Sequence, residues 1–554
     1  MAEQLSSTEK IKTASDGLRG TLTESLGDEL TGAIREDDQA LIKFHGMYQQ
    51  DDRDRRDERA EKKLERLFSF MIRLRLTGGF LTGEQWVASH NIAGENSTGI
   101  IKITTRQTIQ LHGILKSRLK PTIKAFNEAK LNSIATCGDI NRNVLCSAHP
   151  KQSPIHEEIF EFANDISNML LPKTRAYYEI WLDEEKIVDK KAEEDPLYQD
   201  RYMPRKFKIA IAIPPNNDVD VFGNDLGLIA IIEDNKLKGF NVAIGGGLST
   251  THGYAQTYAR LATVIGFVES GEKALKAIYE ILTVQRDFGN RSDRKLARLK
   301  YTVDKMGVEN YKEEVEKRIG FKFQDAKPYS FTERKDYYGW YQNSESKWYY
   351  TVFVENGRIL DDEKLALKSA MLEVAKTCKA NFRFTTNQNV IISDIAPEDK
   401  DTVDEILNKF KIVEHTNGAS VIRKNAMACV ALPTCPLALA EAQRYMPSLL
   451  TKIESLLEKN NLNNEEIIIR MTGCPNGCAR SYIAEIGFVG TALGKYNLHL
   501  GGDHEGFRLN KIYKESLEET AILRELDILF ADFKKERQPN ERFGDYTYRK
   551  IFNN

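Results

Sequence analysis

The sequence predicts an α+β protein built by duplication, in the order A-B-A′-B′, with approximate twofold symmetry and a cofactor site where the halves join. Two observations lead to this prediction. The unit G-G-F-L-T-G-E-Q-W followed by I-K-I-T-T-R-Q-T-I returns in residues 357–390 as G-R-I-L-D-D-E-K-L followed by F-R-F-T-T-N-Q-N-V. A second unit, in residues 213–247, matches G-C-P-N-G-C, E-I-G-F-V-G-T and K-Y-N-L-H-L-G-G-D near the C-terminus. Two units that recur in the same order indicate duplication.

The 554 residues are enough for about three to four domains, and a hydrophobic content of 41% can bury several cores. The repeats divide the chain into a charged N-terminal arm and four units. These are the arm 1–65, the ferredoxin-like half-domain A at 66–135, the α+β domain B at 136–330, A′ at 331–415 and B′ at 416–554.

The arm contains the charged run Y-Q-Q-D-D-R-D-R-R-D-E-R-A-E-K-K. Such a run is typical of a solvated helix face or loop, and the alternative is that the arm wraps the body or docks a partner. The sequence leaves both interpretations open.

Unit A joins a helix-like stretch to an alternating strand, which sends Ile101, Ile103, Ile109 and Leu111 to one face. The opposite face carries hydrogen-bonding side chains, namely Lys102, Thr104, Arg106, Thr108, Gln110 and His112. In the second copy three of these become Asn387, Ile391 and Ser393, so the donor-rich face belongs mainly to the first half. This face is either a solvated strand face or a surface that binds a polyanion.

Unit B mixes strands such as F-K-I-A-I-A-I with helices such as E-K-A-L-K-A-I-Y-E-I-L. Its G-G-G-L-S segment at 245–249 lacks the G-x-G-x-x-G context of a dinucleotide site, so we expect a turn or a cofactor contact there.

Positive charge gathers in the first half. Arg73 and Arg75 precede a Gly-Gly pair, Arg142 lies in I-N-R-N-V-L, and Lys206 and Lys208 lie in P-R-K-F-K. Taken alone, each of these arginines is interpreted as an ordinary ion-pairing residue. Collectively they could line one anion pocket, because guanidinium groups bind oxyanions in bidentate fashion and lysine supplies a mobile charge or a proton.

Four of the seven cysteines form two close pairs near the C-terminus, Cys429 with Cys435 and Cys474 with Cys478. The C-x5-C spacing and the absence of histidine inside either pair favour a four-iron cluster over zinc, and unligated thiols remain a third interpretation. The first B unit has Pro214 and Asp218 where its copy has Cys474 and Cys478, so only one half can bind metal in this way. After Pro436 we expect a helix whose N-terminus faces Cys435.

Composition excludes several classes of protein. A net charge of −2 argues against nucleic acid or anionic lipid as a partner, and no apolar run suits a signal peptide or a membrane span. The odd cysteine count favours a reducing compartment, and we expect a cytoplasmic protein.

Two rival functions use the same cysteines. A simple iron-sulfur electron carrier would not need a duplicated scaffold with a basic pocket. A zinc-stabilised nucleic-acid-binding protein should carry a net basic face. Neither accounts for the loss of the cysteines from one repeat only.

With these residues in view, the chain resembles the siroheme- and four-iron-cluster-containing sulfite and nitrite reductase family over nearly its full length. The family pattern C-x5-C followed by C-P-N-G-C is met without departure. F-H-G-M-Y-Q-Q-D-D-R-D, T-R-A-Y-Y-E-I-W-L-D and Q-R-D-F-G-N-R-S-D-R-K resemble the assimilatory, NADPH-dependent branch of the family.

The resemblance implies roles for particular residues. Cys429, Cys435, Cys474 and Cys478 would bind a [4Fe-4S] cluster, and Cys478 would also bridge to the siroheme iron. Four cations would hold the substrate anion: Arg73, Arg142, Lys206 and Lys208. Siroheme carries eight carboxylates, and the residues expected to contact it are Lys102, Arg106, Gln110, His112 and Asn476.

The resemblance also implies a reaction, the six-electron reduction of sulfite to sulfide in assimilatory sulfate reduction and cysteine biosynthesis. Electrons would come from NADPH through a flavoprotein (alpha) component that carries FAD and FMN. Nitrite reduction to ammonia and ferredoxin-dependent sulfite reduction are the alternatives. Nitrite reductases of the family tend to have asparagine at the second lysine of K-x-K, so Lys208 favours sulfite.

Overall fold

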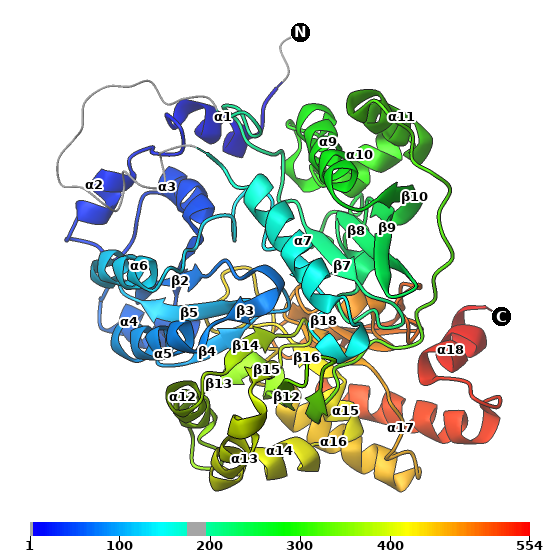
Figure 1. The fold of residues 1–554 in the computed structure, drawn as a ribbon. Coiled ribbons are helices and arrows are strands. Elements are labelled where there is room, and N and C mark those ends of the chain that lie inside the picture. Colours follow the sequence, from blue (N-terminus) through cyan, green and yellow to red (C-terminus); the bar gives the residue numbers. More distant parts are fainter. Residues whose placement is uncertain (1–3, 174–194, 554) are drawn as a thin grey trace.

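The computed structural model describes residues 4–173 and 195–553, and it confirms the predicted α+β class (Figure 1). The described chain forms four five-stranded sheets, two for the A units and two for the B units. Helices cover the sheets, and the described part contains no helix long and apolar enough to cross a membrane.

The sheets of A and A′ exchange a strand with each other, so neither is complete within its own unit. The short strand β3 of the first unit joins β14 of the second, and β13 of the second joins β4 of the first. The first sheet has the order β1 (Met47–Asp51), β2 (Phe68–Arg73), β5 (Ile109–Ile114), β4 (Ile101–Ile103) and β13 (Arg358–Ile359). The second has the order β11 (Gly339–Gln342), β12 (Trp348–Val352), β15 (Val390–Ile395), β14 (Asn381–Phe384) and β3 (Phe80–Leu81).

The exchanged strands are the G-G-F-L and G-R-I-L segments of the sequence repeat, which explains why these segments recur. Beside this contact Trp86, fully buried on the helix after β3, stacks on Phe382 of the other unit with ring centroids 4.6 Å apart. Burial of large aromatic side chains therefore ties the two halves together.

The sheets of B and B′ share one topology. In each, the first three strands pair parallel, and the fourth and fifth each pair antiparallel with the strand before them. The first contains β6 (Leu145–Cys146), β7 (Ile209–Ala212), β8 (Leu226–Glu233), β9 (Lys236–Ile244) and β10 (Thr263–Glu269). The second contains β16 (Ala426–Ala428), β17 (Ile469–Thr472), β18 (Ile486–Ala492), β19 (Lys495–Leu500) and β20 (Lys511–Leu517).

The helices form where apolar residues recur at helical spacing, and a few of them, such as α1 and α5, begin at a capping side chain. In α5 the Thr82 side chain caps the Gln85 amide while the Gln85 side chain caps the Thr82 amide, a reciprocal capping box. The helices of the A units are α5 (Gly83–Asn96), α6 (Leu119–Glu128), α12 (Leu367–Thr377), α13 (Lys400–Lys409) and α14 (Ile412–Gly418). Those of the B units are α7 (His156–Met169), α9 (Glu272–Phe288), α10 (Leu299–Met306), α11 (Val308–Ile319), α15 (Val421–Lys424), α16 (Met446–Lys459), α17 (Glu519–Glu536) and α18 (Phe543–Thr547).

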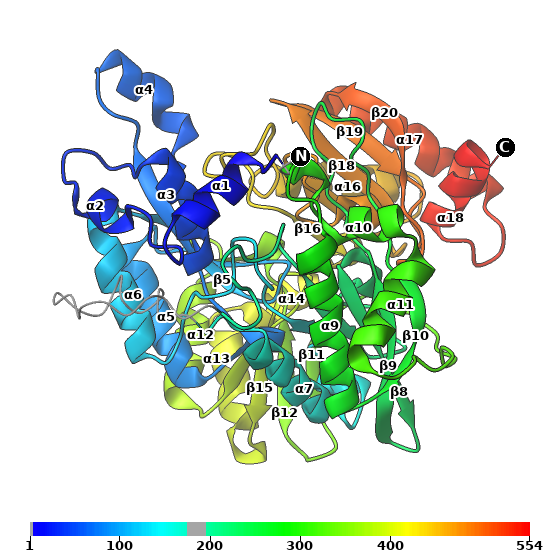
Figure 2. The ribbon, with the colours of Figure 1, turned by 90° about the horizontal axis from the view of Figure 1, so that it is seen from above.

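The N-terminal segment wraps the body, as one of the two interpretations of the arm proposed. Its strand β1 pairs with β2 at the edge of the first sheet, and Arg53 donates to the Ala438 carbonyl oxygen in B′ at 2.7 Å. Figure 2 shows α4 standing out from the rest of the molecule. The helices of this segment are α1 (Ser7–Ala14), α2 (Leu22–Gly27), α3 (Glu36–Leu41) and α4 (Arg56–Glu61).

The donor-rich strand of unit A is a hairpin, not a single strand. Residues 101–103 and 109–114 form β4 and β5, and Lys102 pairs directly with Gln110. The face is also buried rather than solvated, because Lys102 and Gln110 are only 3% and 6% exposed. The solvated-face interpretation is therefore wrong.

A buried carboxylate lies where the two halves meet. Asp220 of B contacts Arg470 and Arg480 of B′ at 2.7 and 2.9 Å. It also contacts Arg334, in the connecting segment between α11 and β11, at 3.1 Å. Burial would raise the pKa of Asp220, but the three guanidinium groups outweigh burial and lower the pKa below its ordinary value. Asp220 and Arg480 occupy equivalent places in the two copies, each before a short 3₁₀ turn.

Replacing Asp220 by Asn should destabilise the protein by about 3–5 kcal/mol, because three buried arginines would lose their counter-ion. Chemical denaturation followed by tryptophan fluorescence measures the change. Asp287→Asn is the control: its carboxylate pairs with Arg318 at the surface, so the same substitution should cost less than about 1 kcal/mol. Equal losses in the two variants would contradict the role of Asp220.

Candidate functional site

The four cysteines follow neighbouring parallel strands. Cys429 comes directly after β16, and Cys474 and Cys478 come after β17. Because parallel strands end at the same edge of a sheet, the loops that carry these cysteines lie together. The Cys429 amide donates to the Met471 carbonyl oxygen at 3.2 Å, which continues the pairing of the two strands to the first cysteine.

The thiols are close enough to affect one another's ionisation. Burial raises the pKa of Cys429, Cys435 and Cys474, and the charge of Cys478 raises each of them further; the pKa of Cys474 reaches about 12. The Gly473 amide donates to Cys429 Sγ at 3.3 Å. A group of buried thiolates needs a cationic centre to be stable, which is what a metal cluster supplies.

Within residues 4–173 and 195–553 there is no group of three or more His, Cys, Asp or Glu side chains that could hold one metal ion. A zinc site requires four ligands around one centre at about 2.0–2.3 Å. A four-iron cluster instead takes one cysteine thiolate on each iron, and the two pairs of cysteines supply four free thiols.

The helix expected after Pro436 does not form. Residues 437–445 are turns, and α16 begins only at Met446. The backbone amides of Leu439 and Ala440 donate instead to the Gly473 carbonyl oxygen, at 2.8 and 3.0 Å. Hydrogen bonds between the two cysteine loops thus replace those of a helix.

The first half contains the same site without its cysteines. Ser147 follows β6 as Cys429 follows β16, and its amide donates to Ile211 as that of Cys429 does to Met471. Ser147 Oγ donates to Asp218 at 2.6 Å, and Asp218 stands where the copy has Cys478. A hydrogen-bonded pair therefore fills the place of a metal site.

Two threonines at equivalent places in the two A units hydrogen-bond to the backbone at Cys478 and at Asp218. Thr105, in the turn between β4 and β5, donates to the Cys478 carbonyl oxygen at 2.9 Å, and Thr386 of the second copy donates to that of Asp218. The repeated Thr-Thr pair of the sequence thus places each A unit against the opposite B unit.

The structure brings Arg73 and Arg142 together at one backbone oxygen. Both guanidinium groups donate to the Thr136 carbonyl oxygen, at 3.2 and 2.8 Å. Arg73 also contacts Cys137 Sγ at 3.4 Å; burial alone would lower the pKa of Arg73, but the charges of Cys137 and Tyr48, and then of Cys478 and Cys435, raise it. The two arginines thus lie beside the cysteine site.

Lys206 and Lys208 are half-buried, and within the described residues no acceptor contacts either ammonium group. Burial lowers the pKa of both lysines well below the ordinary value, and neighbouring cations lower it further. Asp225, and to a smaller extent Cys478, act in the opposite direction on the pKa of Lys208, and the Lys208 backbone amide donates to the Asp225 carboxylate at 2.9 Å. Unpaired cations of this kind favour an anionic ligand.

The predicted donors of the β4–β5 hairpin form one connected set. With its amide oxygen toward Arg73, Gln110 accepts from Arg73 Nε at 2.8 Å and donates to His112 Nε2 at 3.2 Å. His112 also contacts Gln50 at 2.9 Å, and Lys102 donates to the Asn356 carbonyl oxygen. These side chains have partners within the protein.

Arg106 and Asn476 lie apart from that set. Arg106 donates to the Asn224 side chain at 3.0 Å and the Asn143 carbonyl oxygen at 2.6 Å, while its Nε is buried without a partner. Asn476 donates to Cys474 Sγ at 3.5 Å, which associates it with the cysteine loop.

Sequence reasoning missed Tyr48, Cys137 and Thr105. Burial raises the pKa of Tyr48, and Cys137, Arg142 and Arg73 all act on it, so this tyrosine belongs to the same group of side chains. Thr105 could have been found from its recurrence in both copies. Tyr48 and Cys137 lie in single-copy segments, where no repeat marked them.

Comparison with known proteins identifies the family. The model of the nitrite/sulfite reductase ferredoxin-like half domain matches residues 66–129 and 341–410, and that of the nitrite and sulphite reductase 4Fe-4S domain matches residues 162–323. The sulfite reductase [NADPH] hemoprotein beta-component of Leptospira biflexa is 65% identical over 98% of this chain and 97% of its own length. The chain belongs to the nitrite and sulfite reductase family.

Further relatives agree with this assignment. The beta-component of Geobacillus thermodenitrificans is 51% identical over 98% of this chain, and that of Staphylococcus epidermidis is 50% identical over 99%; each match covers 95% of the relative. The NirA protein of Mycobacterium tuberculosis has the same fold, with a TM-score of 0.79 and 24% identity over 99% of this chain and 97% of its own. The predicted motif T-R-A-Y-Y-E-I-W-L-D lies outside the described residues.

The cofactors of this family, siroheme and a [4Fe-4S] cluster, fit the residues present. The matched 4Fe-4S domain covers the first B unit, which lacks the cysteines, so the cluster is assigned from the thiols of the second unit. The four thiols suit the cluster, and the unpaired cations beside Cys478 suit an anionic macrocycle.

Replacing Gly473 by Ala should reduce the iron content of the purified protein. An added Cβ would lie 2.6 Å from Ala431 Cβ and 2.6 Å from the Ala440 carbonyl oxygen, so the loop would have to move away from Cys429. Iron per chain and the cluster absorbance measure the effect, which we expect to be a loss of about half or more, because cluster assembly depends on ligand placement.

Gly94→Ala, on the surface of α5 with nothing within 4 Å of the added carbon, is the matched control and should retain its iron. Full iron content in Gly473→Ala would show that the loop tolerates the displacement.

Proposed function

We propose that this chain catalyses the six-electron reduction of sulfite to sulfide in assimilatory sulfate reduction and cysteine biosynthesis. The observation that carries the proposal is that the β4–β5 hairpin contacts both the cysteine loop and a substrate cation: Thr105 donates to the Cys478 carbonyl oxygen at 2.9 Å, and Gln110 accepts from Arg73 Nε at 2.8 Å. Cations beside the outermost cysteine of a cluster site suit an enzyme that reduces a small anion. The names of the relatives support sulfite as that anion.

Each predicted site residue has a role in this proposal. Cys429, Cys435, Cys474 and Cys478 would hold the cluster, and Cys478, the exposed cysteine of the four, is the one that siroheme would share with it. Bound siroheme and cluster supply single-electron transfer to sulfur. The remaining donors, Lys102, Arg106, Gln110, His112 and Asn476, contact the macrocycle or orient the groups that do.

The substrate oxygens lie within reach of Arg73, Arg142, Lys206 and Lys208. The two arginines are oriented by the shared Thr136 carbonyl oxygen, and Arg142 also donates to the Gly138 carbonyl oxygen, so both guanidinium groups are held in place before the substrate arrives. Pre-organised donors stabilise the more anionic species formed as electrons enter.

The two lysines supply protons. Each sulfite oxygen that leaves as water takes up two protons, and an ammonium group with a lowered pKa is a better acid than an ordinary lysine. An anion bound beside the lysines favours their charged form, so substrate binding loads the site with the protons that the reaction consumes.

Electrons reach the cluster from NADPH through a partner flavoprotein that carries FAD and FMN. The name of the relatives includes NADPH, whereas in this chain the segment 245–249 is irregular, and its Gly247 and Ser249 carbonyl oxygens accept hydrogen bonds from Lys300. The projecting helix α4 of the N-terminal segment is our candidate for docking the flavoprotein (Figure 2).

Changing Lys206 or Lys208 to Ala should lower sulfite turnover by about 10²-fold, because one pre-organised donor to the reacting anion is lost. Siroheme absorbance should stay intact. Turnover is measured with a reduced dye as electron donor, and Lys305→Ala, an exposed lysine on α10, is the control. Unchanged sulfite turnover in both site variants would contradict the role assigned to the lysines. Faster reduction of nitrite than of sulfite by the wild type would identify nitrite as the substrate instead.

Reversing one charge at the C-terminal end of α4 tests whether this helix docks the flavoprotein. Lys62→Glu, at the exposed residue just after the helix, should slow NADPH-driven sulfite reduction through the flavoprotein several-fold, while dye-driven turnover stays unchanged. Lys317→Glu, on the exposed face of α11, is the matched control. Equal rates with NADPH for the two variants would rule α4 out. Removing the whole segment is not a clean test, because β1 belongs to the first sheet.

A further inference from the structure

A buried ion network joins the N-terminal helix α1 to two segments that carry three of the four proposed substrate cations. One segment contains Arg142, and the other contains Lys206 and Lys208. Its acidic members are Glu9 and Asp139, and its central cation is Lys12; none of the three is more than 1% exposed. The network includes Arg291 and Arg294 of the Q-R-D-F-G-N-R-S-D-R-K motif, to which the proposed reaction gives no role.

Asp139 is the centre of the network. Its two oxygens accept a bidentate pair of hydrogen bonds from Arg294, at 2.6 and 2.9 Å. Lys12 lies at 3.5 Å and Arg205 at 3.7 Å. These cations outweigh the effect of burial and hold the pKa of Asp139 below its ordinary value, so the residue is a carboxylate at neutral pH.

Asp139 lies between two backbone segments that are paired with each other. The Met203 amide donates to the Asp139 carbonyl oxygen at 3.0 Å, and that of Phe207 to Ile140 at 3.0 Å. The Arg142 amide donates in turn to the Phe207 carbonyl oxygen at 2.8 Å. One segment carries Arg142 and the other carries Lys206 and Lys208, so a shift of Asp139 is transmitted to all three side chains.

The helix α1 reaches the same place through Lys12. The Lys12 ammonium donates to the Met203 carbonyl oxygen at 2.9 Å and contacts Glu9. Glu9 pairs with Arg291 at 2.6 Å, and the Ser6 amide donates to the Arg291 carbonyl oxygen at 3.0 Å. The helix is therefore held at both of its ends.

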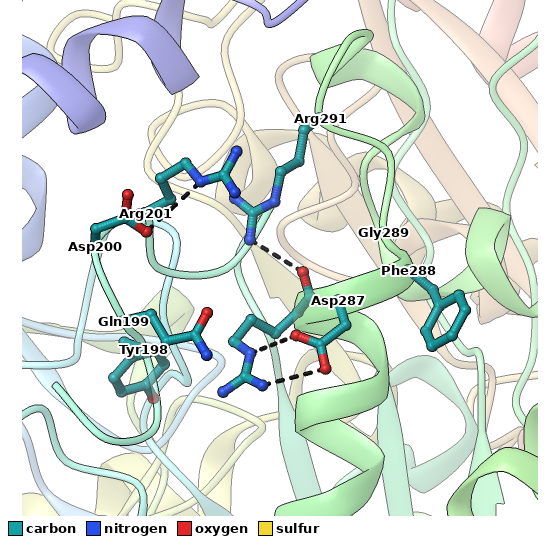
Figure 3. A pocket seen from close by; sticks show the side chains of 9 residues that line it. Tyr198, Gln199, Asp200, Arg201, Asp287, Phe288, Gly289 and Arg291 are labelled. Atoms are coloured by element: carbon teal, nitrogen blue, oxygen red, sulfur yellow. Dashed lines mark hydrogen bonds and ion pairs between the residues drawn. The ribbon is translucent and has the colours of Figure 1, made fainter. Parts of the chain in front are cut away.

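Arg291 connects this network to the surface. Its second nitrogen donates to the carbonyl oxygens of Tyr202 and Arg286, at 2.8 and 3.0 Å. Arg291 lines a pocket of about 410 Å³, and Figure 3 shows it above Asp287. Asp287 in turn accepts from Arg286 at 2.7 Å. Because Arg291 is occupied by its protein partners, we assign it to fixing the segment 202–207 rather than to binding a ligand.

We propose that Lys12 and Asp139 are positioning residues of the anion site, so that the N-terminal helix completes the enzyme from outside the cofactor-binding units. This inference rests on the proposed function for the identity of the anion. A displacement of about 1 Å in a reacting arrangement can cost about 10²-fold in rate, so a network that fixes both cation-bearing segments has a large effect on catalysis.

Lys12→Met is the main test, because methionine keeps an unbranched side chain of similar length and removes the charge. We expect the KM for sulfite to rise roughly tenfold, with siroheme absorbance and iron content retained, because the cations are misplaced rather than removed. Lys12→Arg should restore KM to within about threefold of the wild type. Glu9→Gln, a milder change in the same network, serves if Lys12→Met does not fold.

Hydrogen exchange separates positioning from general stability. Amides in 138–142 and 203–207 should exchange about tenfold faster in Lys12→Met, while those of β18 keep the wild-type rate. Asp38→Asn is the matched control: Asp38 is also buried in the N-terminal segment, but it accepts from Thr21 and Ser25 and does not touch the site segments. It should leave both KM and the exchange of these amides unchanged.

Wild-type KM and wild-type exchange in Lys12→Met, or in Glu9→Gln if that variant replaces it, would overturn the proposal. So would an equal effect from Asp38→Asn, since that would indicate loss of stability alone. If the wild-type enzyme does not reduce sulfite, the proposed function fails, and the exchange rates alone then support or overturn the positioning role.

Discussion

The junction of the two halves depends on one buried carboxylate. Asp220 neutralises part of the charge of three arginines, two from B′ and one from the connecting segment, in a place where water does not reach. A buried charge is tolerated only when it is paired and hydrogen-bonded, so this contact specifies how the copies face each other. Arg480 also donates to the Thr386 carbonyl oxygen at 2.7 Å, and Thr386 holds the Asp218 position, which links the junction to the site geometry.

Duplication supplied two equivalent sites, and the side chains at these sites now differ in their chemistry. One retains four thiols that lie beside unpaired cations. In the other, Ser147 and Asp218 satisfy each other, and His149 contacts Asp336 at 3.3 Å among further buried hydrogen bonds. The second site is closed by its own polar groups, whereas near the first the ammonium groups of Lys206 and Lys208 have no acceptor among the described residues. An anionic ligand is therefore accommodated in one copy only.

Several features could be predicted from the sequence because they are local or repeated. The cysteine spacing predicted a cluster, the recurring units predicted a duplicated α+β architecture, and alternation placed Lys102 and Gln110 on one face. The wrong predictions concern features decided by distant contacts. Instead of a helix after Pro436, backbone amides there donate to the Gly473 carbonyl oxygen, and the donor face is covered by other elements. The pairing of Lys12 with Asp139 joins residues from single-copy segments of no distinctive pattern, so nothing in either segment indicated it.

The exchange of β3 and β13 constrains how the protein can be made. A ribosome completes β4 long before it reaches β13, and at about 5–20 residues per second the interval is some tens of seconds. During that time the outer edge of β4 has no partner strand, and an open sheet edge can pair with a neighbouring nascent chain. The first half must therefore be shielded until the second emerges, and cutting the gene between the repeats would yield two proteins with exposed edges rather than two working halves.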